Sequence, residues 1–267
     1  MSACSRHEWM TVAAARLLPN KSVCFVGIGL PSAACNLARL THAPGIVLIY
    51  ESGTIGTRPD VLPLSIGDGE LAQTAAYVVP LPEVFSYYLQ AGRVDIGFLG
   101  AAQIDRYGNL NSTVIGPYEQ PTTRLPGAGG APEIAMHARQ VFVMAKATKR
   151  SFVERLDFCT SAGYLDGHGA RARSRAPGGG PRAVITDFGM LAPHRETDEL
   201  QLVALFADAS VEEARAAVGW PLKLADDIDT IAPPTPDELD TLRALRARTR
   251  ETHARPVHLP LQPEGLP

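Results

Sequence analysis

The alternation of short aliphatic runs with helical stretches constrains the fold of this chain more than any other feature of its sequence. SVCFVGIG (22–29) and GIVLIY (45–50) have the length and apolar character of buried strands, and a helical pattern covers 32–41 between them. A strand, a helix and a second strand form the unit from which parallel sheets are built. The opening of the chain therefore predicts an α/β fold.

The same alternation continues along the chain. Further strands are expected at 94–100, 140–147, 182–191 and 201–207, and further helices at 7–18, at 82–92 and after Ser210. Ser210 is the expected N-cap of its helix, because Glu213 follows at capping-box spacing. No repeat or linker interrupts this pattern, which predicts a single domain over 1–253 followed by a Pro-rich tail at 254–267.

The segment 167–182 is basic, rich in glycine and without periodicity. Such a composition predicts a surface loop. Two interpretations remain open at this point, a mobile loop and a cradle for phosphate groups.

Composition excludes several classes of function. A chain of 267 residues with 45% hydrophobic and 20% charged residues is ordinary for a soluble globular protein. The net charge of −3 gives no indication of the positively charged surface that would bind nucleic acid or an anionic membrane. No apolar stretch reaches the roughly 18 residues of a membrane span, and the N-terminus lacks a signal core. Four cysteines without C-x-x-C spacing are expected to be free thiols, which favours a cytoplasmic protein.

Glu51 stands at the end of the aliphatic run 45–50. Open parallel sheets bind their ligands at the carboxyl ends of strands, so this position favours a functional carboxylate. Glu51 could act as a general base, as a covalent nucleophile or as a partner for a helix N-terminus. Ser52 is a weaker candidate nucleophile, because its surroundings do not match the G-x-S-x-G elbow.

Two glycine turns are candidate ligand loops. Gly27 and Gly29 lack the full dinucleotide fingerprint and the Walker lysine, so they form either a ligand-facing loop or a tight turn with Pro31 at the first helical position. Gly127, Gly129 and Gly130 precede a helix expected near residue 132, and their N–H groups could stabilise an oxyanion. A flexible loop with positive φ angles is the alternative for this second turn.

The seven histidines show no pattern of metal ligands, and no metal site is expected. His137 lies nearest to the candidate chemistry, but a surface or core role is the favoured interpretation.

Four motifs in order, VGIGLP, YESGTIG, GAAQIDRYGNLNST and LPGAGGAPEIA, resemble the β-type subunit of family I coenzyme A transferases, in the glutaconate CoA-transferase-like branch. The resemblance extends over about residues 5 to 225. It implies an open, mainly parallel α/β sheet flanked by helices. It also implies that Glu51 is the catalytic nucleophile, with Ser52 and Gly53 completing its motif, and that Gly129 and Gly130 assist catalysis at the oxyanion.

The resemblance implies transfer of CoA from an acyl-CoA to a carboxylic acid through a glutamyl-CoA thioester at Glu51. Coenzyme A is then a substrate, and no permanently bound cofactor is expected. The implied substrate-binding residues are Ser52, Gly53, Gly27, Gly29, Gln103 and Gly127, with Tyr107 and Asn109 as weaker candidates. An α-type subunit is the implied partner, in an αβ or α2β2 assembly.

Two alternatives stay open. A CoA-thioester hydrolase could use the same scaffold, although the presence of Glu51 favours transfer. The chain could also be a non-catalytic subunit that binds a ligand or stabilises its partner.

Overall fold

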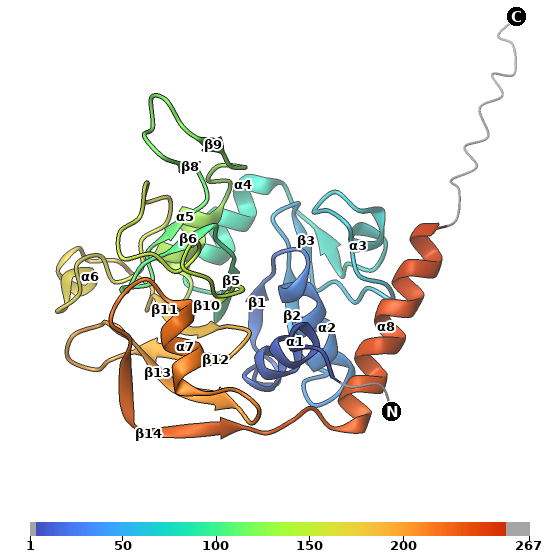
Figure 1. Ribbon diagram of the computed structural model, residues 1–267. Coiled ribbons are helices and arrows are strands. Elements are labelled where there is room, and N and C mark those ends of the chain that lie inside the picture. Colours follow the sequence, from blue (N-terminus) through green and yellow to red (C-terminus); the bar gives the residue numbers. More distant parts are fainter. Residues whose placement is uncertain (1–3, 255–267) are drawn as a thin grey trace, which may run out of the picture.

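A ten-stranded sheet forms the centre of the molecule in the computed structural model, which describes residues 4–254 (Figure 1). The helical elements are α1 (Arg6–Arg16), α2 (Leu30–Leu40), α3 (Gly69–Gln73), α4 (Leu81–Glu83), a π-helical segment η1 (Val84–Leu89), α5 (Ala131–His137), α6 (Ala170–Arg173), α7 (Val211–Ala217) and α8 (Pro236–Ala254). The strands of the first half are β1 (Val23–Phe25), β2 (Val47–Ile49), β3 (Thr54–Ile55), β4 (Tyr77–Val78), β5 (Ile96–Leu99), β6 (Gln103–Ile104) and β7 (Leu110–Asn111). The remaining strands are β8 (Val114–Ile115), β9 (Thr123–Arg124), β10 (Gln140–Met144), β11 (Pro181–Ile185), β12 (Gly189–Pro193), β13 (Leu200–Phe206) and β14 (Lys223–Ile231).

The strand order of the large sheet is β14-β13-β12-β11-β10-β5-β1-β2-β3-β4. Its central strands β11, β10, β5, β1 and β2 all pair in parallel. Antiparallel pairing enters on both sides of this centre, where β12 pairs with β11 and β13, and where β3 pairs with β2 and β4. These pairings confirm the predicted α/β class with a mainly parallel sheet.

Both faces of the central strands are buried, as their nearly continuous apolar sequences predict. Successive residues of a strand point to opposite faces, so Leu48 and Tyr50 belong to one core cluster and Ile49 to the other. The same division separates Phe142 from Val143 on β10. Helices α1, α2 and α8 contribute to the first cluster, and η1, α5 and α7 contribute to the second.

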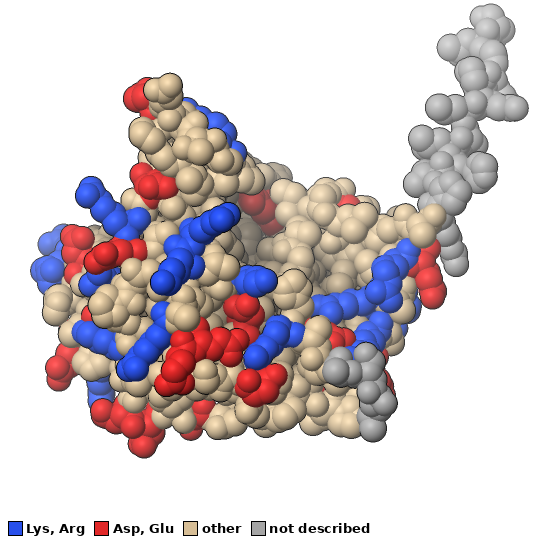
Figure 2. Space-filling model, viewed as in Figure 1, with Lys and Arg blue, Asp and Glu red and all other residues tan. Residues whose placement is uncertain are grey.

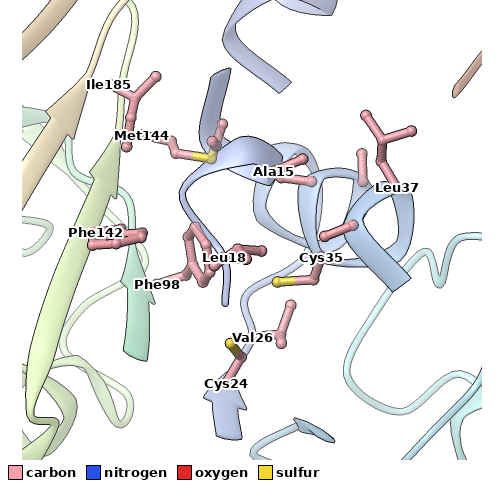
Figure 3. Close-up of a cluster of buried hydrophobic side chains, with 14 of the residues drawn as sticks. Ala15, Leu18, Cys24, Val26, Cys35, Leu37, Phe98, Phe142, Met144 and Ile185 are labelled. Atoms are coloured by element: carbon pink, nitrogen blue, oxygen red, sulfur yellow. The ribbon is translucent and has the colours of Figure 1, made fainter. Parts of the chain in front are cut away.

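Figure 3 shows part of the first cluster, in which Phe98 and Phe142 of the sheet lie among side chains from α1 and α2. The rings of Phe98 and Phe142 meet edge to face, with centroids 5.7 Å apart. Cys24 and Cys35 are fully buried in this cluster and form no disulfide. Burial raises the pKa of the Cys35 thiol, so this cysteine remains protonated and acts as a small apolar side chain.

Helix α1 begins with a complete capping box, in which Ser5 and Glu8 bond each other's backbone N–H groups. Glu8 also pairs with Arg243 of α8 at 2.7 Å, and Arg16 pairs with Glu238 at 2.6 Å. These pairs join the two ends of the chain. Neither α8 nor β14 was expected from the sequence, because most of their side chains are polar and only partly buried.

The single strand predicted at 182–191 is wrong. The segment forms two antiparallel strands, β11 and β12, joined by a turn at 186–188. The Thr186 hydroxyl donates to the Gly189 carbonyl at 2.8 Å and stabilises this turn. A Cβ atom at Gly189 would overlap the carbonyl oxygen of Ala204, so only glycine allows the two strands to approach.

Two other boundaries differ from those predicted. The helix expected at 82–92 is a short α-helical turn followed by the π-helical segment η1. The strand expected at 22–29 ends at Phe25, and residues 28 and 29 form a turn into α2. The helix expected from residue 32 begins two residues earlier, at Leu30, with Pro31 in its first turn.

The basic segment 167–182 is more ordered than the sequence predicted, since it contains α6 and a buried arginine, Arg171. Of the tail predicted at 254–267, Ala254 is the last residue of α8, and 255–267 lie outside the described residues. Within 4–254, no helix is long and apolar enough to cross a membrane. The face in Figure 2 carries basic and acidic side chains intermixed, with no large patch of one sign.

Candidate active site

A pocket of about 590 Å³ opens at the carboxyl ends of β1, β2, β5 and β10. The chain leaves β1 toward β2 on one side and leaves the adjacent β5 toward β10 on the other, and open α/β sheets bind ligands where such connections diverge. The walls are mainly apolar, and they include Phe25, Phe98, Ile134 and Met144. Among the described residues that line the pocket, Glu51 is the only charged one.

Glu51 owes its place to the residues on either side of it. Tyr50 is fully buried and its hydroxyl lies 2.9 Å from the Ser32 hydroxyl of α2, which ties the end of β2 to the helix. Burial raises the pKa of Tyr50, so its hydroxyl remains a neutral hydrogen-bonding group. The Gly53 N–H then donates to the Tyr50 carbonyl at 3.0 Å, which closes a tight turn with Glu51 at its first corner.

The glycine turn 127–130 lies against the Glu51 carboxylate. A Cβ atom placed on Gly130 would lie 3.2 Å from Oε1 of Glu51, and one on Gly129 would lie 4.0 Å from it. The same Cβ on Gly130 would lie 2.6 Å from Cζ of Phe85, so a side chain at this position meets two groups at once. The absence of a side chain therefore lets this backbone approach the carboxylate.

Two N–H groups of this turn are available to a ligand. Those of Gly129 and Gly130 donate to no acceptor within the described part of the chain. The turn itself is anchored, because the Gly127 N–H donates to the Ser112 carbonyl and the Ser112 hydroxyl donates to the Gly127 carbonyl, both at 2.8 Å. Helix α5 follows from Ala131, one residue before the predicted start.

The first glycine turn contributes less than the second. Gly27 lines the pocket, whereas Gly29 is the N-cap of α2, with a φ of +86°. Nothing lies within 4 Å of a Cβ placed on Gly29, so it is the backbone conformation that favours glycine there. The structure thus places a ligand-facing position and a tight turn in the same loop.

Three other predicted residues do not line the pocket. Ser52 and Gly53 follow Glu51 in its turn, and a Cβ on Gly53 would overlap the Val79 carbonyl, which indicates a backbone role there. Gln103 is buried, and its amide donates to the Asp157 carboxylate at 2.9 Å. Its carbonyl accepts from Asn111 at 2.7 Å, so the structure gives Gln103 partners within the protein.

Tyr107 and Asn109, the weaker candidates, line a separate hollow of about 390 Å³ together with Asp105. Burial raises the pKa of Asp105, although hydrogen bonds from Asn109 and Tyr107 lower it. His137 bonds within α5 through the Glu133 carbonyl, and it does not line the pocket. No group of three or more potential metal-binding side chains occurs among residues 4–254.

The sequence did not indicate the apolar walls of the pocket. Phe98 and Met144 lie at or near the ends of predicted parallel strands, so strand ends were an available signal for them. Phe85 does not line the pocket, but its ring lies beside Gly130; no signal in the sequence indicated this contact, because η1 brings Phe85 there from a distant part of the chain.

An open, mainly parallel sheet with a carboxylate-centred apolar pocket at its strand ends places this chain among α/β proteins of the ligand-binding, open-sheet class. The profile described as coenzyme A transferase matches residues 7–215. The chain therefore belongs to the coenzyme A transferase family.

The similarity extends over nearly the whole chain. It is 54% identical over 253 residues to the B subunit of 3-oxoadipate CoA-transferase from Pseudomonas knackmussii, covering 95% of this chain and 97% of that one. It is 36% identical over 232 residues to the B subunit of glutaconate CoA-transferase from Acidaminococcus fermentans, covering 85% and 86%. The crystal structure of glutaconate CoA-transferase from Acidaminococcus fermentans superposes with a TM-score of 0.87 at 32% identity, covering 96% of this chain and 99% of that one. These comparisons confirm the predicted family and fold class.

Proposed function

We propose that this chain is the β-type subunit of a CoA-transferase and that Glu51 is its covalent nucleophile. The observation that carries the proposal is the contact between the Glu51 carboxylate and the turn at Gly129 and Gly130, whose N–H groups have no acceptor in the described structure. A nucleophile beside fixed donors is the arrangement that acyl transfer requires.

The proposed reaction begins when the Glu51 carboxylate attacks the carbonyl carbon of the acyl-CoA. The C–S bond breaks, which gives an acyl-glutamyl anhydride and CoA thiolate. The thiolate then attacks the glutamyl carbonyl, which releases the first acid as its carboxylate and leaves a glutamyl-CoA thioester. The acceptor carboxylate attacks this thioester and the steps reverse, so that Glu51 is regenerated and no water or other reagent is consumed.

Each tetrahedral intermediate carries a negative oxygen, and we assign its stabilisation to the N–H groups of Gly129 and Gly130. Removing one such donor typically costs about a hundredfold in rate. The apolar walls of the pocket favour the same chemistry, because few water molecules can then solvate the carboxylate or hydrolyse the anhydride.

The substrate acids that we propose are short dicarboxylic acids, including 3-oxo acids. The support is the similarity to subunits named for 3-oxoadipate and glutaconate, both of which are dicarboxylates. Among the described residues that line the pocket, there is no lysine, arginine or histidine that could bind a second carboxylate. We therefore propose that an α-type chain completes the site and supplies the positive charge.

The test uses the complex of this chain with its α-type partner. The complex is incubated with 3-oxoadipyl-CoA, treated with borohydride and digested for mass spectrometry. We expect a mass change on the peptide that contains Glu51, and neither label nor CoA transfer in Glu51→Gln. Glu212→Gln, which alters an exposed carboxylate on α7, is the matched control and should behave as the wild type.

Either of two outcomes would contradict the proposal and support another function. Thioester loss that needs no acceptor acid would identify a hydrolase on the same scaffold. Full transfer by Glu51→Gln without any label would assign the working carboxylate to the partner chain, and this chain would then be a non-catalytic subunit.

A further inference from the structure

Arg171 of α6 is a buried arginine whose contacts the proposed reaction does not use. Its side chain lies among backbone carbonyls from three segments, two of them within ten residues of Arg171 and the third at the distant end of α5. The acceptors are the carbonyl oxygens of Ala135, Met136, Ala162, Gly163 and Gly178, at 2.6 to 3.3 Å. A guanidinium has five N–H donors, so this set of acceptors matches its full capacity.

No ion pair among the described residues includes Arg171, even though it is only 5% exposed. Burial lowers the pKa of Arg171, but a guanidinium still carries its charge at neutral pH. The carbonyl dipoles therefore solvate this charge. Two of them belong to the last turn of α5, where the helix leaves carbonyls without intrahelical partners.

The glycines of the same segment bring its backbone against the end of α5. The N–H of Gly178 donates to the Met136 carbonyl at 2.8 Å, and that of Gly179 donates to the Arg139 carbonyl at 3.1 Å. A Cβ atom on Gly178 would overlap the Ala138 carbonyl. The glycine-rich composition of 167–182 therefore serves close backbone contact with α5.

Helix α5 connects the segment bound by Arg171, at its C-terminal end, to the glycine turn of the active site, at its N-terminal end. It has seven residues, and the Gly130 carbonyl accepts from the Ile134 N–H at 3.0 Å in its first turn. Helix α5 also packs on β5. A Cβ atom on Gly97 of β5 would overlap the Ile134 side chain of α5. A shift of the helix along its axis would therefore move Gly129 and Gly130 relative to Glu51.

We propose that Arg171 is a positioning residue, which holds the last turn of α5 so that the N–H groups of Gly129 and Gly130 meet the reacting atoms at Glu51. The inference rests on the function proposed above. It assigns to the segment 167–182 the role of a clamp on α5. The segment is then neither a mobile loop nor a phosphate cradle at this arginine, because all five guanidinium donors are engaged within the protein.

The test compares Arg171→Lys and Arg171→Met in the complex with the α-type partner. Lysine keeps the charge with three donors, and methionine removes both charge and donors. We expect kcat to fall by about tenfold in Arg171→Lys and by about a hundredfold in Arg171→Met, because misplacement by about 1 Å has effects of this size. KM for the acyl-CoA should change by less than about threefold, since the pocket walls are retained.

Arg173→Met is the matched control, because Arg173 lies on the same helix and is exposed, and its side chain donates to the His168 carbonyl and not to α5. Its kcat should equal that of the wild type. Hydrogen–deuterium exchange of residues 127–138 gives a readout independent of activity. We expect exchange there to become about tenfold faster in both Arg171 variants, with the central strands unchanged.

Wild-type kcat in a folded Arg171→Met complex, or unchanged exchange at 127–138, would overturn the inference. If Arg171→Met does not assemble, Arg171→Lys carries the same comparison. Failure of the proposed function is recognised separately, because wild-type complex would then transfer CoA without labelling Glu51. In that case faster exchange in Arg171→Lys would still support the clamp on α5, and unchanged exchange would reject it.

Discussion

At the scale of single residues, the candidate site depends on one position where a side chain does not fit. A Cβ atom on Gly130 would meet both the Glu51 carboxylate and the ring of Phe85. The φ of Gly130, −81°, is open to every amino acid, so space and not backbone conformation favours glycine here. This separates Gly130 from Gly127 and Gly129, whose φ angles are +101° and +49°.

Gly130→Ala is expected to lower the rate of CoA transfer by about a hundredfold, because the new methyl group displaces either Phe85 or the Glu51 carboxylate. The measurement is kcat of the complex, with its thermal midpoint as the test of folding. Gly69→Ala is the control, since no atom lies within 4 Å of a Cβ at this position. An active Gly130→Ala variant would contradict the tight contact with Glu51.

At the scale of elements, the sequence predicted those whose pattern is local and strong. The parallel strands β1, β2, β5 and β10 were expected within a few residues, because each is a short apolar run bounded by turn residues. The hairpin at β11 and β12 was missed, since its two strands and the turn between them read as one apolar run. Helix α8 was missed because only Leu242 and Leu245 on it are fully buried.

The ion pair between Glu8 of α1 and Arg243 of α8 predicts that the stability of the protein decreases at low pH. Hydrogen bonds from Arg243 lower the pKa of Glu8 from 4.5 to about 2, so the folded state prefers the ionised carboxylate. This contribution is complete above about pH 4.5 and is lost as the pH falls through about 2. Thermal midpoints measured across this range should fall less steeply in Glu8→Gln than in the wild type. Glu251→Gln, an exposed carboxyl on α8, should keep the wild-type slope.

At the scale of the whole molecule, the first and last described helices, α1 and α8, pack against each other. Helix α8 also packs on α2 of the opening β-α-β unit, which α1 precedes, with Leu242 completely buried in the same cluster as Trp9 and Leu37. The outer layer on this side of the sheet therefore combines the two ends of the chain (Figure 1). The core beneath the first strands is complete only when α8 is in place.

Leu242→Ala should therefore destabilise the protein by roughly 2 to 5 kcal/mol, the range for a buried leucine replaced by alanine. The free energy of unfolding in urea measures this loss. Leu64→Ala is the matched control, because Leu64 is 65% exposed and the same substitution there should cost far less. Equal losses in the two variants would show that α8 does not complete the core.

The sequence by itself determined the α/β class, the parallel centre of the sheet and the position of Glu51 at a strand end. The strands and helices follow from periodicity, which is a local property of the sequence. The place of Glu51 follows from its position directly after a strand, because open parallel sheets bind ligands at the carboxyl ends of their strands. Only the tertiary structure decided which groups meet there. Gly130 reaches Glu51, and Arg171 reaches the end of α5, through packing between segments far apart in the chain. No local pattern encodes such contacts, because they depend on how whole elements are placed against one another.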